Sequence, residues 1–302
     1  MTVRRWQALI LAIVAAGAVG DTYAQSQSEP AAVEVESGDR GTEKFSLPPG
    51  ARVERDLAYG PAAAQKLDVY IPESAKRAPI LLMVHGGGWM FGDKTNPGVV
   101  GSKARHWLPR GYIVVSANYR MARPPNPLDQ TEDVGRALAF VQANASLWGG
   151  DGSRVVLMGH SSGAHLVALL AALPAVVARS GAKPWLGTVA LDSAALDLVE
   201  LMRGSHPRLH DRVFGAEPGR WAEMSPLHQL TTRTPPILVV CSSRRGDSCP
   251  AARRFAAKAV SLGGQATVLP VDLGHGEINS ELGRSAGYTA SVDDFLRSLG
   301  LP

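Results

Sequence analysis

Short, wholly apolar runs rich in β-branched residues recur along the chain, with turn residues between them. The strand-like segments are residues 66–72, 78–85, 111–119, 154–159, 187–192, 235–241 and 266–272. Between these segments, apolar residues fall at helical spacing around residues 134–141, and again in 252–262 and 291–299. A strand buried on both faces requires such an apolar run. The pattern therefore predicts an α/β fold, with a mostly parallel central sheet covered by helices on both faces.

The N-terminal segment has the three parts of a secretory signal. Arg4 and Arg5 precede an apolar stretch over residues 8–19, which is too short to span a bilayer comfortably, and Ala24 offers a small residue for cleavage. We expect a signal peptide over residues 1–24 that is cleaved after Ala24; an uncleaved anchor is the alternative. The polar stretch that follows predicts a flexible leader over residues 25–50. Residues 51–302 then form one domain.

Composition and charge narrow the classes of partner. The chain has 302 residues, of which 45% are hydrophobic, so it is long enough to bury a large core. Its net charge of +4 comes from interspersed acids and bases without a basic block, which argues against nucleic acid. We expect a periplasmic or secreted protein with no stable membrane insertion after signal removal; the oligomeric state stays open. In an oxidising compartment the closely spaced Cys241 and Cys249 predict a disulfide bond.

The stretch "RVVLMGHSSGAHLVALL" (residues 154–170) combines an apolar strand, a tight turn and a helix. A serine at the tip of such a turn needs small residues two positions before and after it, because strand and helix crowd there. Gly159 and Gly163 satisfy this spacing for Ser161, whereas the matching positions for Ser162 are not glycine. Ser161 is therefore the candidate nucleophile, and the Ser162 N–H points toward the site. An ordinary turn with a capping serine is the alternative.

A second glycine-rich stretch, "HGGGWMFGDK" (residues 85–94), follows another apolar run. Backbone N–H groups of such a loop can bind the oxyanion that forms when a hydroxyl attacks a carbonyl. Gly87 and Gly88 are the candidate donors together with Ser162, and the Trp89 N–H is a further candidate. A phosphate-binding loop would carry Lys and Ser or Thr directly after the glycines, where this chain has Trp89 and Met90 instead.

These motifs resemble those of the α/β-hydrolase fold, in particular the hormone-sensitive-lipase-like and feruloyl-esterase-like carboxylesterases with an H-G-G-G motif. The resemblance covers about residues 50–300, including "LDVYIP", "HGGGW", "GHSSG" and "SPLHQLTTRTPPILVVC". It implies residues 51–302 as a catalytic domain with an oxyanion hole at the glycine loop and no metal or organic cofactor. The stretch from residue 193 to 230 is short, which implies little or no cap.

The resemblance also implies the chain order nucleophile, acid, histidine. His275 in "VDLGHGEIN" follows the last predicted strand and takes the histidine position. The loop that carries the acid in this family reads "CSSRRGDSCP" here, which makes Asp247 the expected acid, with Asp272 as the alternative. We expect the Cys241–Cys249 disulfide to fix the Asp247 carboxylate against His275.

The expected function is that of an exported serine carboxylesterase, which hydrolyses small-molecule esters through an acyl-enzyme. Trp89, Met90 and Phe91 are expected to line the mouth of the site, with Trp89 binding substrate. With little chain for a cap, this predicts short-chain or aromatic esters. The alternatives are an amide hydrolase of the same fold, similar to arylformamidases, and a non-catalytic hydrolase-like binding protein.

Overall fold

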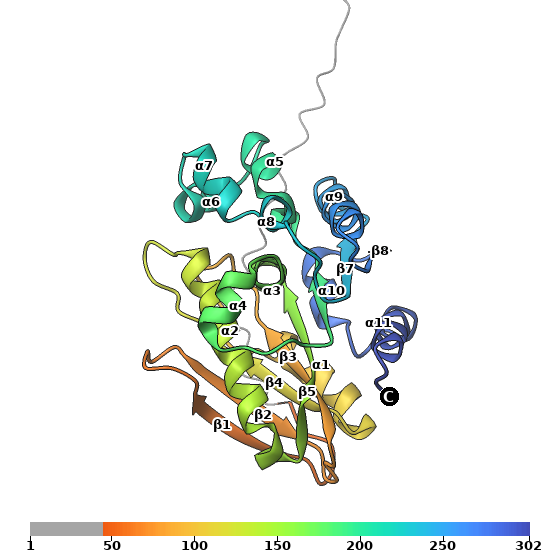
Figure 1. Cartoon of the computed structure of the whole chain (residues 1–302). Coiled ribbons are helices and arrows are strands. Elements are labelled where there is room, and N and C mark those ends of the chain that lie inside the picture. The colour runs from red at the N-terminus through yellow and green to blue at the C-terminus, as the bar shows by residue number, and fades with distance from the viewer. Residues whose placement is uncertain (1–44) are drawn as a thin grey trace, which may run out of the picture.

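A computed structural model describes residues 45–302 of the chain, in which eight strands form one sheet (Figure 1). The predicted signal peptide and most of the predicted leader lie outside the described residues. The described end of the leader, residues 45–50, places the Phe45 ring 5.7 Å from that of Tyr70. Among residues 45–302, no single helix is long and apolar enough to cross a membrane; α3 (Ser162–Ala172) and α4 (Pro174–Ser180) meet those criteria only as a pair bent by 94°.

The sheet has the order β1-β2-β4-β3-β5-β6-β7-β8. Strands β3 to β8 run parallel, whereas β1 and β2 are antiparallel to their neighbours. The strands are β1 (Arg52–Ala58), β2 (Lys66–Ile71), β3 (Ala78–Val84), β4 (Ile113–Ala117), β5 (Gly150–His160), β6 (Gly187–Leu191), β7 (Ile237–Ser242) and β8 (Ala266–Val271). The predicted α/β class and mostly parallel sheet are confirmed.

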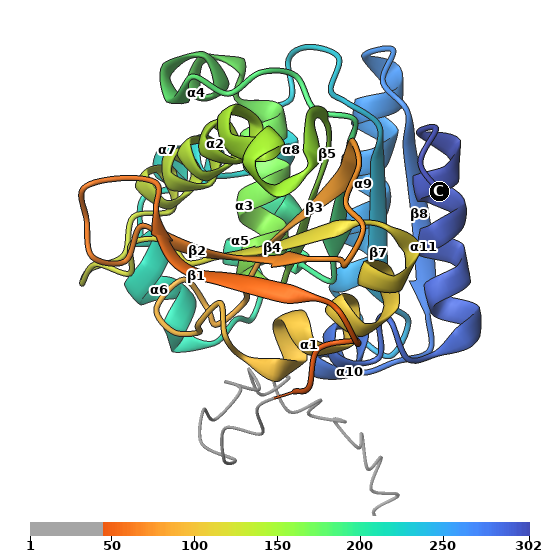
Figure 2. The same cartoon turned by 90° about the horizontal axis from the view of Figure 1, so that it is seen from below.

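Helices cover both faces of this sheet (Figure 2). They are α1 (Pro97–Trp107), α2 (Pro127–Asn144), α3 (Ser162–Ala172), α4 (Pro174–Ser180), α9 (Ser248–Ser261), α10 (His275–Ser280) and α11 (Ala286–Ser298). Alternate side chains of each strand point to opposite faces. In β3, Ile80 and Leu82 pack with α2, α3 and α9, whereas Leu81 and Met83 pack with α1 and α11.

The segment between β6 and β7 forms a small cap of short helices. These are α5 (Leu198–Arg203), α6 (Arg208–Phe214), α7 (Pro218–Glu223) and α8 (Pro226–Gln229). In Figure 1 they lie together above α3, beyond the same edge of the sheet at which the parallel strands end. This agrees with the expectation of little or no cap, and it places α6 over the glycine loop that follows β3.

Candidate active site

The turn between β5 and α3 holds Ser161 at its tip. Ser161 has a φ angle of 56°, which residues other than glycine rarely adopt. This backbone conformation is therefore strained. A Cβ atom added to Gly163 would lie 2.3 Å from the Val84 carbonyl oxygen, and one added to Gly159 would lie 2.3 Å from the Gly163 carbonyl oxygen. Glycine is therefore required at both positions, and the structure places Ser161 rather than Ser162 at the tip.

His275 reaches Ser161 from the first position of α10, directly after the loop that follows β8. Its Nε2 atom lies 2.9 Å from the Ser161 Oγ atom, within hydrogen-bond distance for a hydroxyl donor and an imidazole acceptor. The Nε2–H of His160 donates to the His275 carbonyl oxygen over 2.9 Å and holds the start of α10 against the end of β5. The structure thus brings together the two residues that the sequence proposed as nucleophile and base.

The carboxylate that faces His275 belongs to Asp192, the residue directly after β6. Its Oδ2 atom lies 2.5 Å from the His275 Nδ1 atom, and its side chain is fully buried. The Ser242 N–H donates to Oδ1 over 2.8 Å, and the Ser248 hydroxyl donates to the same oxygen. Arg245 donates to Oδ2 over 2.8 Å. A buried carboxylate needs such donors, because desolvation without compensation disfavours its charged form.

The prediction that Asp247 contacts His275 is wrong. The Asp247 carboxylate is 43% exposed and pairs with Arg245 at 2.9 Å. The alternative acid, Asp272, pairs with Arg244 at 2.8 Å instead of contacting His275. The reason lies in the sheet order, since β6 is adjacent to β5 and ends at the same edge, so Asp192, the residue that follows β6, comes within hydrogen-bond distance of the imidazole.

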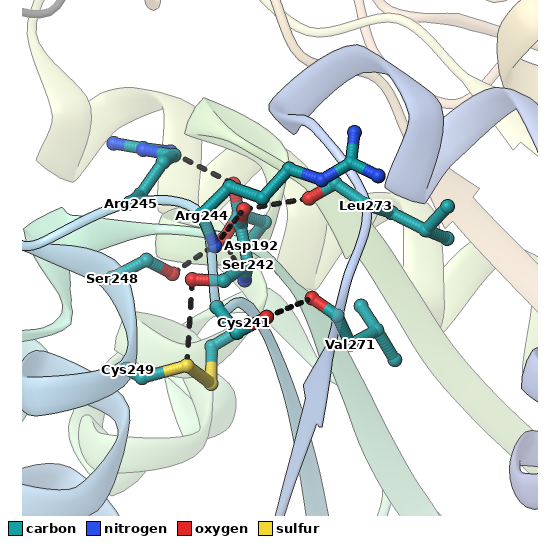
Figure 3. The surroundings of a disulfide bond; sticks show 10 residues. Asp192, Cys241, Ser242, Arg244, Arg245, Ser248, Cys249, Val271 and Leu273 are labelled. Carbon is teal, nitrogen blue, oxygen red and sulfur yellow. Dashed lines mark hydrogen bonds and ion pairs between the residues drawn. A yellow bond between two sulfur atoms is a disulfide. The ribbon is translucent and has the colours of Figure 1, made fainter.

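The predicted Cys241–Cys249 disulfide is confirmed, with a Cα–Cα distance of 5.1 Å, and it has a different neighbour from the one expected. It joins the end of β7 to the first turn of α9 and closes the loop that carries the donors to Asp192. Figure 3 shows Ser242, Arg245 and Ser248 converging on the Asp192 carboxylate from this loop. The bond therefore fixes the surroundings of Asp192 rather than the position of Asp247.

The loop after β3 has the form expected of an oxyanion-binding turn. Gly87 has a φ angle of 120°, and a Cβ atom there would lie 2.2 Å from the Phe91 carbonyl oxygen. The N–H of Phe91 closes the turn by donating to the Gly87 carbonyl oxygen over 3.0 Å. Within residues 45–302, the N–H groups of Gly87, Gly88 and Ser162 donate to no backbone or side-chain atom, which leaves them for a substrate oxygen, and the same holds for the further candidate, the Trp89 N–H.

Trp89 does not line an open mouth, and that expectation is wrong. Its side chain is only 4% exposed and packs edge-on against Phe214 of α6, with ring centroids 4.7 Å apart. An indole N–H buried among apolar groups needs an acceptor, and it finds the His165 Nδ1 atom at 3.1 Å. Met90 is half-buried, and Phe91, 41% exposed, is the most exposed residue of this group.

Comparisons with known proteins place this geometry in a family. The BD-FAE family profile matches residues 67–245, which is more than half of the chain. The chain belongs to the BD-FAE family. It is 30% identical over 263 residues to esterase LipQ of Mycobacterium tuberculosis, covering 80% of this chain and 61% of LipQ. It is 34% identical over 118 residues to a probable isoprenylcysteine alpha-carbonyl methylesterase of rice, covering 39% of this chain and 28% of that protein.

The aligned regions therefore span between about a quarter and three fifths of these curated relatives. Among solved structures, esterase 2 of Thermogutta terrifontis superposes with a TM-score of 0.67 at 22% identity, covering 84% of this chain and 97% of that one. Esterase B of Lactobacillus rhamnosis, inhibited by a tributyrin phosphonate, gives a TM-score of 0.68 at 18% identity, covering 85% and 87%. At such identity the likeness shows the shared fold, which is the α/β-hydrolase fold.

Charges at the site of this BD-FAE member are arranged around the Asp192 carboxylate. Burial alone would raise the pKa of Asp192, but the hydrogen bond from His275 and the charge of Arg245 lower it well below its usual range. Burial, reinforced by the neighbouring His275, lowers the pKa of His160 well below its usual value. Asp192 is therefore ionised and His160 neutral at neutral pH.

Two further histidines beside Trp89 are also neutral at neutral pH. Burial lowers the pKa of His165 to about 4. Burial, followed by the charge of His206, lowers the pKa of His210 to about 4. The Nε2–H of His165 donates to the Met224 carbonyl oxygen over 2.8 Å, while its Nδ1 atom accepts from Trp89. His165 thus connects the oxyanion loop to the cap through a single tautomer.

Sequence reasoning missed Asp192 and Arg245. Asp192 ends the segment "GTVALD", which was identified as a strand but not as the start of a site loop. Two features of the sequence could have indicated Asp192. It follows a predicted strand directly, and the order Ser161, Asp192, His275 satisfies the family's chain order as well as the order with Asp247 does. Arg245 carries no motif, and only the folded loop shows its contact with Asp192.

Proposed function

We propose that this protein is an exported serine carboxylesterase that hydrolyses short-chain or aromatic carboxylic esters through an acyl-enzyme. The observation that carries the proposal is the continuous hydrogen-bonded series Ser161–His275–Asp192. It lies at the strand edge where the Gly87–Gly88 turn presents its N–H groups. A nucleophile, a base, an orienting acid and an oxyanion site are the parts that acyl transfer requires.

In the proposed mechanism, His275 accepts the Ser161 proton at Nε2 as the Ser161 Oγ atom attacks the ester carbonyl carbon. The carbonyl oxygen becomes an oxyanion, which the N–H groups of Gly87, Gly88 and Ser162 stabilise. His275 then returns the proton to the departing alcohol, leaving Ser161 acylated. Water, deprotonated by His275, hydrolyses the acyl-enzyme. Asp192 holds the proton on the His275 Nδ1 atom throughout and stabilises the imidazolium.

The cap supports the proposed preference for short or aromatic acyl groups. Helix α6 approaches the oxyanion loop so closely that a Cβ atom on Gly88 would lie 2.6 Å from the Leu209 Cδ2 atom. Such close packing limits the length of acyl chain that fits between the loop and the cap. Exposed Phe91 at the rim suits an aromatic group.

Export is supported by the N-terminal pattern and by the disulfide, since disulfides persist in oxidising compartments. We expect the mature chain to begin at Gln25. Mass spectrometry of protein recovered outside the cytoplasm tests this directly, and an intact Met1 on that protein would contradict cleavage after Ala24.

The activity itself is tested with soluble p-nitrophenyl esters of increasing acyl length and an aryl phosphonate ester that labels reactive serines. We expect Ser161→Ala to lower kcat/KM by several orders of magnitude and to abolish labelling, because the triad acts as a unit. The matched variant Ser162→Ala keeps its backbone donor and is expected to be much milder. A clear optimum on long-chain emulsified triglycerides, or faster turnover of aryl amides than of aryl esters, would contradict the proposed substrate class.

A further inference from the structure

An arginine contacts both the acid and the base of the proposed triad. The Arg245 Nη1 atom lies 2.8 Å from the Asp192 Oδ2 atom and 2.8 Å from the His275 Nδ1 atom. His275 Nδ1 is itself 2.5 Å from the same Asp192 oxygen. Three polar groups therefore meet at one point, and one carboxylate oxygen accepts from two nitrogens.

This arrangement allows two tautomers of the neutral His275 ring, with opposite consequences for catalysis. If Nδ1 carries the imidazole proton, both nitrogens donate to Asp192, and Nε2 is free to accept the Ser161 proton. If Nδ1 is bare, Arg245 donates to it, and Nε2–H faces Ser161 in the unreactive tautomer. The balance depends on how strongly Asp192 attracts the Nδ1 proton, and Arg245 weakens that attraction by placing a positive charge on the same oxygen.

Asp247 offsets this effect from the other end of the guanidinium. Its carboxylate accepts from the Arg245 Nη2 atom over 2.9 Å and so holds Nη1 toward Asp192. Arg245 is 24% exposed and Asp247 is 43% exposed, so neither charge is fully screened by water. The charges of Asp192, Arg245 and Asp247 sum to one negative charge. Protonation of the His275 imidazole neutralises that charge.

We propose that Arg245 and Asp247 form a positioning pair that sets the charge around Asp192, and thereby the pH below which His275 ceases to act as a base. The inference rests on the proposed function of the same site. The inference assigns a role to the loop after β7, although the Asp247 carboxylate in this loop does not contact His275. Arg245 acts through Asp192 and His275 and touches no reacting atom.

Other charged or titratable groups surround the imidazole, and within residues 45–302 none of those named below hydrogen-bonds to the Asp192 carboxylate. His160 at the end of β5 packs against the ring at 4.7 Å, and burial keeps it neutral. His210 of α6 lies within the electrostatic influence of Arg245 and Asp247, and burial keeps it neutral at neutral pH. The remaining groups lie on neighbouring elements: Lys103 of α1, whose charge acts on His160; Arg244, paired with Asp272 and Glu277; and Tyr288 of α11, on which the charge of Asp192 acts.

The first experiment measures kcat/KM for a soluble aryl ester across the pH range, comparing single variants of the pair. Arg245→Gln keeps a donor for Asp192 but removes the positive charge, so the acid limb of the profile should move up by about one pH unit. Asp247→Asn leaves that charge uncompensated, so the limb should move down, by about half a unit because the site is partly solvated. The opposite directions distinguish an electrostatic effect from a general loss of structure.

Two further variants serve as controls. Arg245→Lys keeps the charge but not the two-pronged geometry, so the acid limb should stay in place while the maximal rate falls. Arg244→Gln removes an exposed arginine from the same loop and should shift the limb by less than about 0.3 units, because solvent screens it. Equal shifts for Arg244→Gln and Arg245→Gln would overturn the proposal.

A second measurement does not require ester hydrolysis. NMR titration of histidine-labelled protein follows the His275 ring, assigned by its loss in His275→Gln, and should show the same opposite displacements. Displacements in one direction, or none, overturn the inference in either experiment. Failure of the proposed function has a different signature: the unaltered protein neither hydrolyses aryl esters nor labels at Ser161, while the NMR titration still decides the role of Arg245.

Discussion

Acidification is expected to destabilise the protein through His165, the histidine that connects the oxyanion loop to the cap. Its side chain is fully buried, and its two nitrogens have opposite roles: Nδ1 accepts from Trp89, and Nε2–H donates to Met224. Protonation would place a second donor against the Trp89 N–H, so the folded state excludes the charged form. Burial lowers the pKa of His165 from 6.5 to about 4.

The sign follows from proton linkage. An unfolded chain binds a proton at His165 below about pH 6.5, whereas the folded chain does so only near pH 4, so stability is complete above the higher value and falls between the two. A shift of this size corresponds to about 2.5 kcal/mol of lost stability between about pH 8 and pH 4.5. Urea unfolding under non-reducing conditions at both pH values measures it.

His165→Gln is the matched variant, because its amide still donates toward Met224 but does not titrate in this range. We expect the variant to be less stable at about pH 8 and to lose about 2.5 kcal/mol less than the unaltered protein on acidification, since all other titrating groups are common to both. Identical losses for the two proteins would refute the argument and would mean that His165 is protonated in the folded state at low pH.

Two further predictions concern the supports of the site. Gln130→Leu removes the amide that donates to the Trp89 carbonyl oxygen over 2.8 Å. Because this loosens the oxyanion loop, kcat should fall roughly 10- to 100-fold. An unchanged kcat with only a lower melting temperature would contradict this. Replacing both Cys241 and Cys249 by serine should reduce the free energy of unfolding by about 2–3 kcal/mol and also lower kcat, because the loop around Asp192 becomes freer. Unchanged urea denaturation and unchanged kcat would refute that prediction.

The fold was largely predictable because the strands of the parallel part are buried on both faces. Segments such as "ILLMV" in β3 are apolar throughout and need no periodicity to be identified. Strand β1, "RVERDLA", escaped prediction because it is an exposed edge strand whose side chains lack an apolar run. The cap helices escaped because each is only about one or two turns long, and such short segments carry little periodic signal.

The site was predictable where its geometry is local. Ser161 and the glycine loop depend on backbone turns that only particular residues allow, so their spacing is visible in the sequence. The acid is a single carboxylate brought to His275 from a different strand, and nothing in its neighbouring residues separates Asp192 from Asp247. The expectation that Trp89 lines the mouth of the site is wrong for a similar reason, because its indole is buried against α6, a helix that lies far along the chain.

The identity of the acid is the central claim, and one comparison tests it most directly: kcat/KM of Asp192→Asn against Asp247→Asn for the same aryl ester at about pH 8. An amide at the acid position accepts poorly from Nδ1–H and favours the wrong histidine tautomer, which costs about 10⁴-fold in Ser–His–Asp hydrolases. We expect a loss of about that size for Asp192→Asn and a loss within about tenfold for Asp247→Asn. A large loss for Asp247→Asn with near-normal activity for Asp192→Asn would contradict the account.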